Sequence, residues 1–254
     1  MAKLLEVSDL SVRFGGLTAV NEVSLAVADG EICALIGPNG AGKTSLFNAI
    51  AGYVPVQSGR VLYRGEPIQG LTPHEIAARG VRRTFQNGGL FGDLTALENV
   101  LVGMHGVVGS NFLGIVLGSA RAARSEAAGT AKARDLLGLM DLLHVADQPA
   151  RALSGGQQRM VEIVRALATN PPLLLLDEPA VGLAPPMRLQ LGEIIRSLAR
   201  DRGIGILLIE HAIELVMDIS DRVVVLNYGR KVADGSPRQI RTDRNVLEAY
   251  LGHA

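Results

Sequence analysis

Residues 37–44 read Gly37-Pro38-Asn39-Gly40-Ala41-Gly42-Lys43-Thr44, and the rest of the chain is arranged around them. They match the phosphate-loop pattern G-x-x-x-x-G-K-[ST] at every fixed position. The apolar run before them, 32–36, predicts a strand, and the periodic run after them, 46–50, predicts a helix. Glycines let the backbone turn tightly, so that successive N–H groups and the helix N-terminus point at an anionic phosphate. The sequence therefore predicts a nucleotide-binding α/β domain.

The two residues that close this loop carry the expected chemistry. Lys43 is expected to reach the β- and γ-phosphates of the nucleotide, and the Thr44 hydroxyl is expected to bind Mg²⁺. The alternative is a glycine-rich turn with a surface lysine, and the predicted strand and helix on either side argue against it.

Composition sets broad limits on function. The 254 residues suffice for one large α/β domain or two small ones. Twenty-five basic residues balance twenty-five acidic ones, so charge favours neither nucleic acid nor an anionic membrane surface as a partner. Cys33 is the one cysteine and is expected to be a buried, inert thiol in a reducing cytosol.

The sequence also bears on whether the chain is exported or crosses a membrane. Residues 1–6 predict no export signal, because an acid interrupts them before any apolar segment of export length. The longest apolar stretches fall well short of the roughly eighteen to twenty residues that span a bilayer. The mean hydropathy of +0.25 is nevertheless high for this charge content, and it leaves apolar surface for a partner.

An acidic pair follows the continuous apolar strand predicted at 173–176. Asp177 and Glu178 thus stand at the carboxyl end of a buried parallel strand, where open α/β sheets bind ligands. Neighbouring residues of a straight strand point opposite ways, but here the strand is ending. Asp177 is expected to organise Mg²⁺ through its water shell, and Glu178 to orient or deprotonate the attacking water. The alternative is a pair of solvated loop acids.

Gln86 and His211 also terminate predicted strands, at 81–87 and 204–209. Gln86 is a candidate for contact with Mg²⁺ or the attacking water, and a solvated loop residue is the alternative. His211 is a candidate for contact with the γ-phosphate, and a structural histidine is the alternative. The other four histidines show no ligand spacing that would indicate a zinc site.

A second glycine-rich helix start reads Leu153-Ser154-Gly155-Gly156-Gln157 and precedes a helix predicted at 158–169. Two glycines and a hydroxyl at a helix start suit an anionic phosphate, although a serine cap alone would also explain them. Residues from about 94 to 153 carry helical periodicity and predict an inserted helical subdomain.

The amino-terminal part predicts an antiparallel β-structure. Residues 4–10 and 23–27 alternate in polarity, and the pair Gly15-Gly16 between them predicts a turn. Phe14 lies at the tip of this turn. It is a candidate platform for an adenine ring, with simple packing as the alternative.

With these elements in this order, the chain resembles the ATP-binding subunits of ABC transporters over essentially its full length. The resemblance implies one α/β domain of the P-loop NTPase class. Its RecA-like core and antiparallel β-subdomain would occupy about 1–93 and 158–254, and its helical subdomain about 94–157. ATP and Mg²⁺ are the cofactors that the resemblance implies.

The resemblance also implies roles for the residues named above. The catalytic residues would be Lys43, Gln86, Glu178 and His211, and Mg²⁺ would be held by Thr44, Gln86 and, through water, Asp177. ATP would be bound by Phe14, Gly37, Pro38, Asn39, Gly40, Ala41, Gly42, Lys43, Thr44 and Ser45. In a head-to-tail dimer, a second copy would cap this ATP with its Ser154, Gly155, Gly156 and Gln157.

Four shorter sequence segments resemble the branched-chain amino acid uptake group of these transporters. The matching segments are Arg83-Thr84-Phe85-Gln86-Asn87, Leu94-Thr95-Ala96-Leu97-Glu98-Asn99-Val100, Gly182-Leu183-Ala184-Pro185 and Glu248-Ala249-Tyr250-Leu251-Gly252. The group implies an ATP-hydrolysing motor that imports leucine, isoleucine and valine and lies on the cytoplasmic face of the membrane. The implied partners are a second ATPase subunit, identical or different, integral permease subunits and an extracytoplasmic solute-binding protein.

Other functions stay open at this point. The ATP-binding subunits of transporters for urea, amides or lipopolysaccharide share many of these sequence segments. A soluble ABC ATPase of DNA repair or of the ribosome would predict a coiled-coil insertion, a basic face or a duplicated cassette, and the sequence has none of these. We therefore expect no nucleic-acid partner.

Three positions depart from the usual ABC pattern. Residues 181–184 lack the aspartate that many ABC ATPases carry after the catalytic glutamate, and this bears on how that loop couples two sites. Ala212 stands where an aspartate is common. Phe14 replaces the more usual tyrosine and keeps the stacking face.

Overall fold

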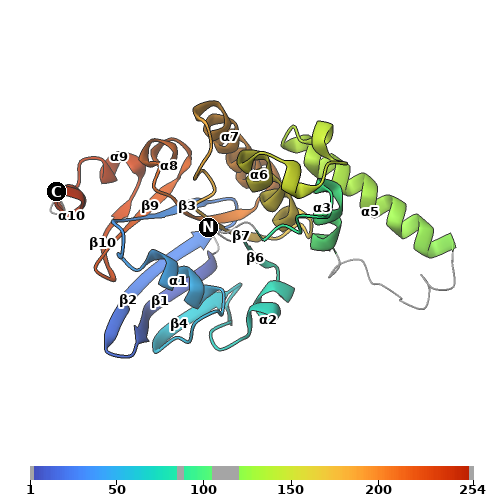
Figure 1. The fold of residues 1–254 in the computed structure, drawn as a ribbon. Helices are drawn as coiled ribbons and strands as arrows, with labels where there is room; N and C mark the ends of the chain where they lie inside the picture. The colour runs from blue at the N-terminus through green and yellow to red at the C-terminus, as the bar shows by residue number, and fades with distance from the viewer. Residues whose placement is uncertain (1–2, 85–88, 105–119, 252–254) are drawn as a thin grey trace. The chain divides into compact units, whose positions relative to one another are not determined.

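The computed structural model describes residues 3–84, 89–104 and 120–251 (Figure 1). The chain forms two compact units. The sheet unit consists of Met1–Arg83, Pro172–Val181 and Arg188–Ala254, and the helical unit consists of Thr84–Pro171 and Gly182–Met187. The helical unit covers the predicted subdomain range of 94–157 and extends beyond it on both sides. Which residues belong to the helical subdomain as a functional part stays a prediction.

In the larger sheet of the sheet unit, the strand that leads into the phosphate loop lies near the middle of the strand order. Its strands lie in the order β10-β9-β3-β8-β7-β6. They are β3 (Ile32–Ile36), β6 (Val81–Arg83), β7 (Leu173–Asp177), β8 (Gly205–Ile209), β9 (Arg222–Asn227) and β10 (Arg230–Gly235). All neighbours pair in parallel except β10, which is antiparallel to β9. The carboxyl ends of β3, β7 and β8 therefore meet at one edge, where such sheets bind ligands.

The smaller sheet confirms the predicted antiparallel β-structure. Its order is β2-β1-β4-β5, with β1 (Lys3–Phe14), β2 (Leu17–Ala28), β4 (Ser58–Tyr63) and β5 (Glu66–Pro67). β1 and β2 are longer than the predicted strands at 4–10 and 23–27. Their pairing shifts register at several points, for example between Val7 and Leu10. Each bulge interrupts the two-residue period, so the alternation of polarity does not follow the whole strand.

The core of the sheet unit lies on both faces of the larger sheet. On one face, Cys33 and Leu35 pack in a cluster that includes Leu46 and Phe47 of α1 (Lys43–Ile50) and the apolar side of the smaller sheet. On the other face, Ala34 and Ile36 pack with residues of β9 and of the helices α8 (Ile213–Ile219), α9 (Pro237–Ile240) and α10 (Arg244–Leu251). Because both faces are covered, β3, β8 and residues 173–176 of β7 are continuously apolar rather than alternating.

Cys33 has the environment expected of an inert thiol. It is fully buried, and burial raises the pKa of its thiol far above the ordinary value. The thiolate that would react is therefore not formed near neutral pH.

The helical unit contains α3 (Ala96–Met104), α5 (Ala120–Leu139) and α6 (Gly155–Leu167), with 3₁₀ turns at Leu143–Val145 and Ala150–Ala152. α3 packs on both α5 and α6. The approach of α3 to α6 is close, because a Cβ at Gly103 would lie 2.6 Å from the carbonyl oxygen of Arg165. α6 begins three residues before the predicted start, since its first turn includes the two glycines.

Two further helices complete the described structure. α2 (Pro73–Ala78) follows β5, and the longer α7 (Pro185–Arg202) precedes β8. Among the described residues, no helix combines the length and the apolar character that crossing a bilayer requires.

Candidate active site

The phosphate loop leaves β3 and enters α1 through residues whose backbone only glycine adopts easily. Gly40 and Gly42 have φ angles of +78° and +98°. A Cβ at Gly42 would lie 2.3 Å from the carbonyl oxygen of Ala19, so the loop passes β2 at a distance that excludes any side chain. Gly42 is the N-cap of α1, and no side chain of the described residues accepts a hydrogen bond there. The first N–H groups of α1 thus have no side-chain cap within the described residues, which is the arrangement that suits an anion at a helix start.

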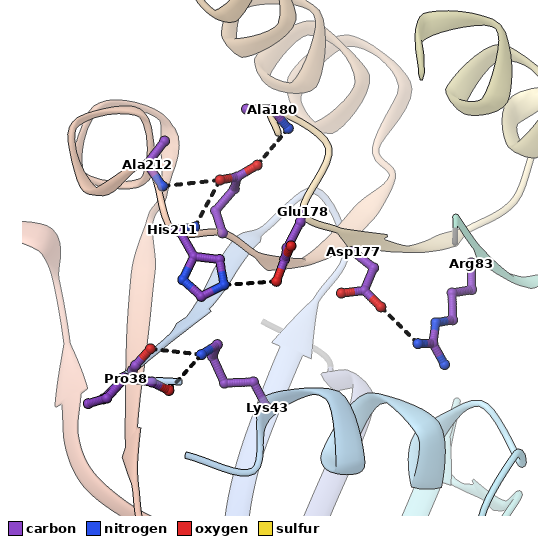
Figure 2. Close-up of polar contacts among 10 residues, drawn as sticks. Pro38, Lys43, Arg83, Asp177, Glu178, Ala180, His211 and Ala212 are labelled. Carbon is purple, nitrogen blue, oxygen red and sulfur yellow. Dashed lines mark hydrogen bonds and ion pairs between the residues drawn. The ribbon is translucent and has the colours of Figure 1, made fainter. Parts of the chain in front are cut away.

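Lys43, the first residue of α1, folds back over the loop (Figure 2). Its Nζ donates hydrogen bonds to the carbonyl oxygens of Gly37, at 2.7 Å, and of Pro38, at 3.0 Å. Burial lowers the pKa of Lys43, and the nearby carboxylates of Glu178 and Asp177 oppose this shift. The ammonium group is therefore held at the loop by backbone oxygens, where phosphate oxygens would be stronger acceptors.

Asp177 ends β7 and forms a buried ion pair. Its Oδ2 accepts a hydrogen bond of 2.8 Å from the guanidinium of Arg83, and the two side chains are 1% and 8% exposed (Figure 2). The carboxylate is thus held in one orientation at the carboxyl edge of the sheet. The sequence placed Asp177 here but gave no sign of its partner.

Glu178 follows Asp177 with a left-handed backbone, with a φ of +48°, so the chain turns directly after β7. Its N–H still donates to the carbonyl oxygen of Ile209, which ties the turn to β8. Its Oε1 lies 2.8 Å from Nε2 of His211, so the two predicted catalytic side chains are hydrogen-bonded to each other (Figure 2). An ionised carboxylate can only accept, so Nε2 then carries the proton.

Glu210 is a buried carboxylate that the sequence analysis did not single out. It is 2% exposed. Its Oε1 accepts a hydrogen bond of 2.6 Å from the N–H of Ala180, and its Oε2 accepts from the N–H groups of His211, at 2.9 Å, and Ala212, at 3.1 Å. Glu210 therefore joins the turn after β7 to the turn after β8. Its position directly before His211, at the end of an apolar strand, was the available signal.

A cavity of about 510 Å³ brings most of the predicted residues together. Phe14, residues 39–45, Glu178 and His211 all line it. Phe14 is 47% exposed and lies on the same cavity as Lys43, so its ring is accessible to a bound base. The prediction that Phe14, the loop and the two catalytic side chains serve one ligand agrees with this arrangement and stays a proposal.

Tyr228 also lines the cavity and was not among the predicted residues. It lies in the turn between β9 and β10 and is 75% exposed. The turn is fixed on both sides, because the N–H of Gly229 donates to the oxygen of Ala41 and the N–H of Asn21 donates to the oxygen of Gly229. An aromatic residue in a turn gives no sequence signal for this position, because pairing with the loop is a tertiary contact.

The remaining predicted residues lie elsewhere. Gln86 falls outside the described residues. Ser154, Gly155, Gly156 and Gln157 belong to the helical unit, where Ser154 is the N-cap of α6. Gln157 N–H donates to Ser154 Oγ at 3.3 Å, and Ser154 N–H donates to Gln157 Oε1 at 2.9 Å. This reciprocal capping box confirms the serine cap and leaves the contact with a second copy as a prediction.

The donor set for a cation fits Mg²⁺. Thr44 and Asp177 offer oxygen atoms, which Mg²⁺ prefers. Among the described residues, no group of three histidine, cysteine, aspartate or glutamate side chains could hold a metal ion. A cation at this site would therefore depend on phosphate oxygens and water for most of its ligands, as Mg²⁺ commonly does.

Comparison with known proteins agrees with this geometry. The model of a family described as "ABC transporter" matches residues 20–181, and a second, described as "Branched-chain amino acid ATP-binding cassette transporter", matches residues 230–254. The chain is 46% identical over 251 residues to the high-affinity branched-chain amino acid transport ATP-binding protein BraF of Pseudomonas aeruginosa, covering 99% of this chain and 98% of BraF.

Two further similarities span nearly the whole chain. LivG of Escherichia coli K12, a high-affinity branched-chain amino acid transport ATP-binding protein, is 43% identical over 251 residues, covering 99% of this chain and 98% of LivG. The crystal structure of a nucleotide-free ATP-binding cassette from an ABC transporter superposes with a TM-score of 0.85 at 32% identity, covering 98% of this chain and 99% of the other.

Proposed function

The chain belongs to the ATP-binding subunits of ABC transporters, and from this premise we propose that it is the motor of an importer for branched-chain amino acids. Members of the family hydrolyse ATP to power transport. The observation that carries the hydrolytic part is that Lys43, Glu178 and His211 line one cavity. The cargo is supported by the similarity to BraF and LivG and by the match of residues 230–254 to the branched-chain model.

Binding of ATP in this proposal uses the open helix start. The N–H groups of the loop and the Lys43 ammonium hold the β- and γ-phosphates, and Phe14 stacks on adenine. Thr44 would hold Mg²⁺ directly, Asp177 through water, and Gln86 is a further candidate ligand. The ion supplies charge neutralisation on the phosphates.

Hydrolysis in this proposal uses the hydrogen-bonded pair. Glu178 orients the attacking water or takes its proton, and the hydrogen bond from His211 fixes the carboxylate. Glu210 holds the backbones of both turns, so the pair is oriented before ATP arrives. Preorganised groups of this kind lower the barrier because they need not rearrange during the reaction.

A second chain completes the site in this proposal. The start of α6 from the other subunit, with Ser154, Gly155, Gly156 and Gln157, covers the triphosphate. The partner is a second copy or a related ATPase, and integral permease subunits recruit the pair to the cytoplasmic face of the membrane. An extracytoplasmic solute-binding protein delivers the cargo.

The variant Glu178→Gln tests the hydrolytic part. It keeps the size of the side chain and one acceptor oxygen, but it removes the charge and replaces the second acceptor with a donor. We expect ATP binding to be retained, turnover to be lost, and an ATP-dependent dimer to appear in light scattering. Glu193→Gln, at an exposed position of α7, is the matched control and should turn over ATP like the wild type. A Glu178→Gln protein that stays monomeric in ATP would contradict the two-chain site.

The intact complex tests the cargo. We would isolate it with its permease subunits and measure its ATPase in the presence of the binding protein and one candidate solute at a time. Stimulation by leucine, isoleucine or valine supports the proposal. Stimulation by urea or an amide instead, or co-purification with lipopolysaccharide, would assign the chain to another ABC transporter.

A further inference from the structure

Arg83 stands where the larger sheet meets the phosphate-loop helix. It is the last residue of the edge strand β6, and its register partner on β7 is Leu175. Leu175 and Asp177 are two residues apart, so they point to the same face of the sheet. That face is the one covered by α1, because Leu175 packs in the cluster that contains Leu46 and Phe47.

The guanidinium of Arg83 joins α1 to β7. Its NH2 group donates to Asp177 Oδ2 at 2.8 Å, and its NH1 group donates to Asn48 Oδ1 on α1 at 2.6 Å. The same group lies over two aromatic rings, with its central carbon 5.8 Å from the ring centre of Phe47 and 5.5 Å from that of Tyr53. Four contacts, from β7, from α1 and from Tyr53 in the turn after α1, thus hold one planar cation.

Only an arginine can make this set of contacts. A guanidinium presents several donors in a rigid fork and stacks on aromatic faces, whereas a lysine ammonium is a single point charge on a flexible stem. The pair with Asp177 is also almost fully buried. A buried carboxylate without its cation is strongly destabilised, so the position needs a positive charge in any case.

We propose that Arg83 is a positioning residue of the ATPase: by binding Asn48 and Asp177 together, it sets the placement of the Asp177 carboxylate relative to α1. Thr44 lies in the first turn of α1, so the link fixes two oxygen donors that would serve the same cation. Mg²⁺ demands near-ideal octahedral geometry, and a small displacement of one donor weakens its binding. The inference rests on the proposed function, since it requires that MgATP is bound at this site.

The expected signature is a loss of coupling between Mg²⁺ and nucleotide. We would measure the affinity of the full chain for ADP by titration calorimetry, with and without Mg²⁺, for the wild type and for Arg83→Lys. Without Mg²⁺, the affinity of the variant should match that of the wild type. We call the factor by which Mg²⁺ increases the affinity for ADP the Mg²⁺ enhancement. It should be about 10-fold smaller, or smaller still, in the variant than in the wild type, the usual effect of losing an outer-shell partner. A purely structural ion pair would not separate the two conditions.

Arg82 provides the matched control. It precedes Arg83 on the same strand, and its NH1 group donates to the carbonyl oxygen of Ala77 in α2. Arg82→Lys should therefore leave the Mg²⁺ enhancement at the wild-type value. Bound Mn²⁺, followed by its electron paramagnetic resonance signal, gives a second readout that does not depend on turnover.

Each outcome decides a separate question. An Arg83→Lys protein with wild-type Mg²⁺ enhancement overturns the inference and leaves the proposed function intact. A wild-type chain that binds no nucleotide overturns the proposed function itself. If Arg83→Lys does not fold, Asn48→Ala takes its place, because it removes the hydrogen bond between Arg83 and α1 and keeps Asp177 paired. Wild-type enhancement in Asn48→Ala would likewise overturn the inference.

Discussion

The two glycine-rich helix starts differ in whether a side chain caps their first backbone N–H groups. One is the start of α1 in the sheet unit, and the other is the start of α6 in the helical unit. Every helix begins with N–H groups that have no partner within the helix. At α1 the N-cap is the left-handed Gly42, and no described side chain caps it. At α6 Ser154 and Gln157 cap each other reciprocally. The start of α1 is thus open to a phosphate as its cap, whereas α6 is already capped by its own chain.

The glycines of the two starts also differ in what surrounds them. A Cβ at Gly42 would clash with backbone, whereas a Cβ at Gly155 would meet no described atom within 4 Å. Gly42 is therefore required for the loop to fold. Gly155 is not required by the fold of its own unit, and in the proposed function its role is toward the ATP of another chain.

The largest expected effect comes from exchanging these glycines for alanine. Gly42→Ala should lower the free energy of unfolding by about 3 kcal/mol, because a left-handed alanine costs about 1–2 kcal/mol and the clash adds about 1–3 kcal/mol. Gly155→Ala should leave it unchanged or raise it by up to about 1 kcal/mol. Urea unfolding of the nucleotide-free chain measures both. Equal losses of unfolding free energy in the two variants would contradict the proposed difference between the two helix starts.

The second-largest effect is a loss of turnover, and it is expected from a change at the uncapped start of α1. Lys43→Met should lower the turnover number roughly 100-fold or more, as the loss of a preorganised donor does. Circular dichroism should show the same fold, because the hydrogen bonds that Lys43 donates within the described residues go to backbone oxygens of its own loop. Lys132→Met, at an exposed position of α5, is the control and should keep its activity. Wild-type turnover in Lys43→Met would remove the loop from the mechanism.

A smaller effect separates the cap at α6 from its proposed contact with phosphate. Ser154→Ala removes the capping oxygen and should cost about 1 kcal/mol of stability. Ser154→Asp restores a capping oxygen, so stability should return, but its charge should repel the triphosphate and lower turnover. Thermal unfolding and ATPase rates of the two variants together give the answer. Full activity in Ser154→Asp would argue against a phosphate beside this helix start.

The smallest effect is a pH dependence that only the open start should show. Burial lowers the pKa of Lys43 below its ordinary 10.5 in the folded chain. Between the lowered pKa and 10.5 the unfolded chain binds more protons than the folded one, so stability rises with pH in this interval. The free energy of unfolding of the wild type should therefore rise relative to Lys43→Met there. If the wild type and Lys43→Met differ in free energy of unfolding by the same amount across this pH interval, the lowered pKa is contradicted. The wild type and Ser154→Ala should differ by a constant amount.

Much of the larger sheet could be predicted from local patterns. The apolar strands at 173–176 and 204–209 are there because strands covered on both faces are apolar throughout. The extent of β1 and β2 was underestimated, because bulges break the alternation on which the prediction relied. The limits of the helical subdomain stay a prediction, since periodicity shows that a helix exists but not which neighbours it packs against.

The chain's own residue order determined the phosphate loop, the acidic pair and the two helix starts, because each depends on contacts within a few residues. The tertiary structure alone decided that Arg83 pairs with Asp177, that Glu210 ties the turns of Glu178 and His211 together, and that Tyr228 lines the cavity. These contacts join strands far apart in the chain, and no local spacing encodes which strands become neighbours. Pairing between distant strands is settled by burial of the whole core, so it becomes visible only in the folded molecule.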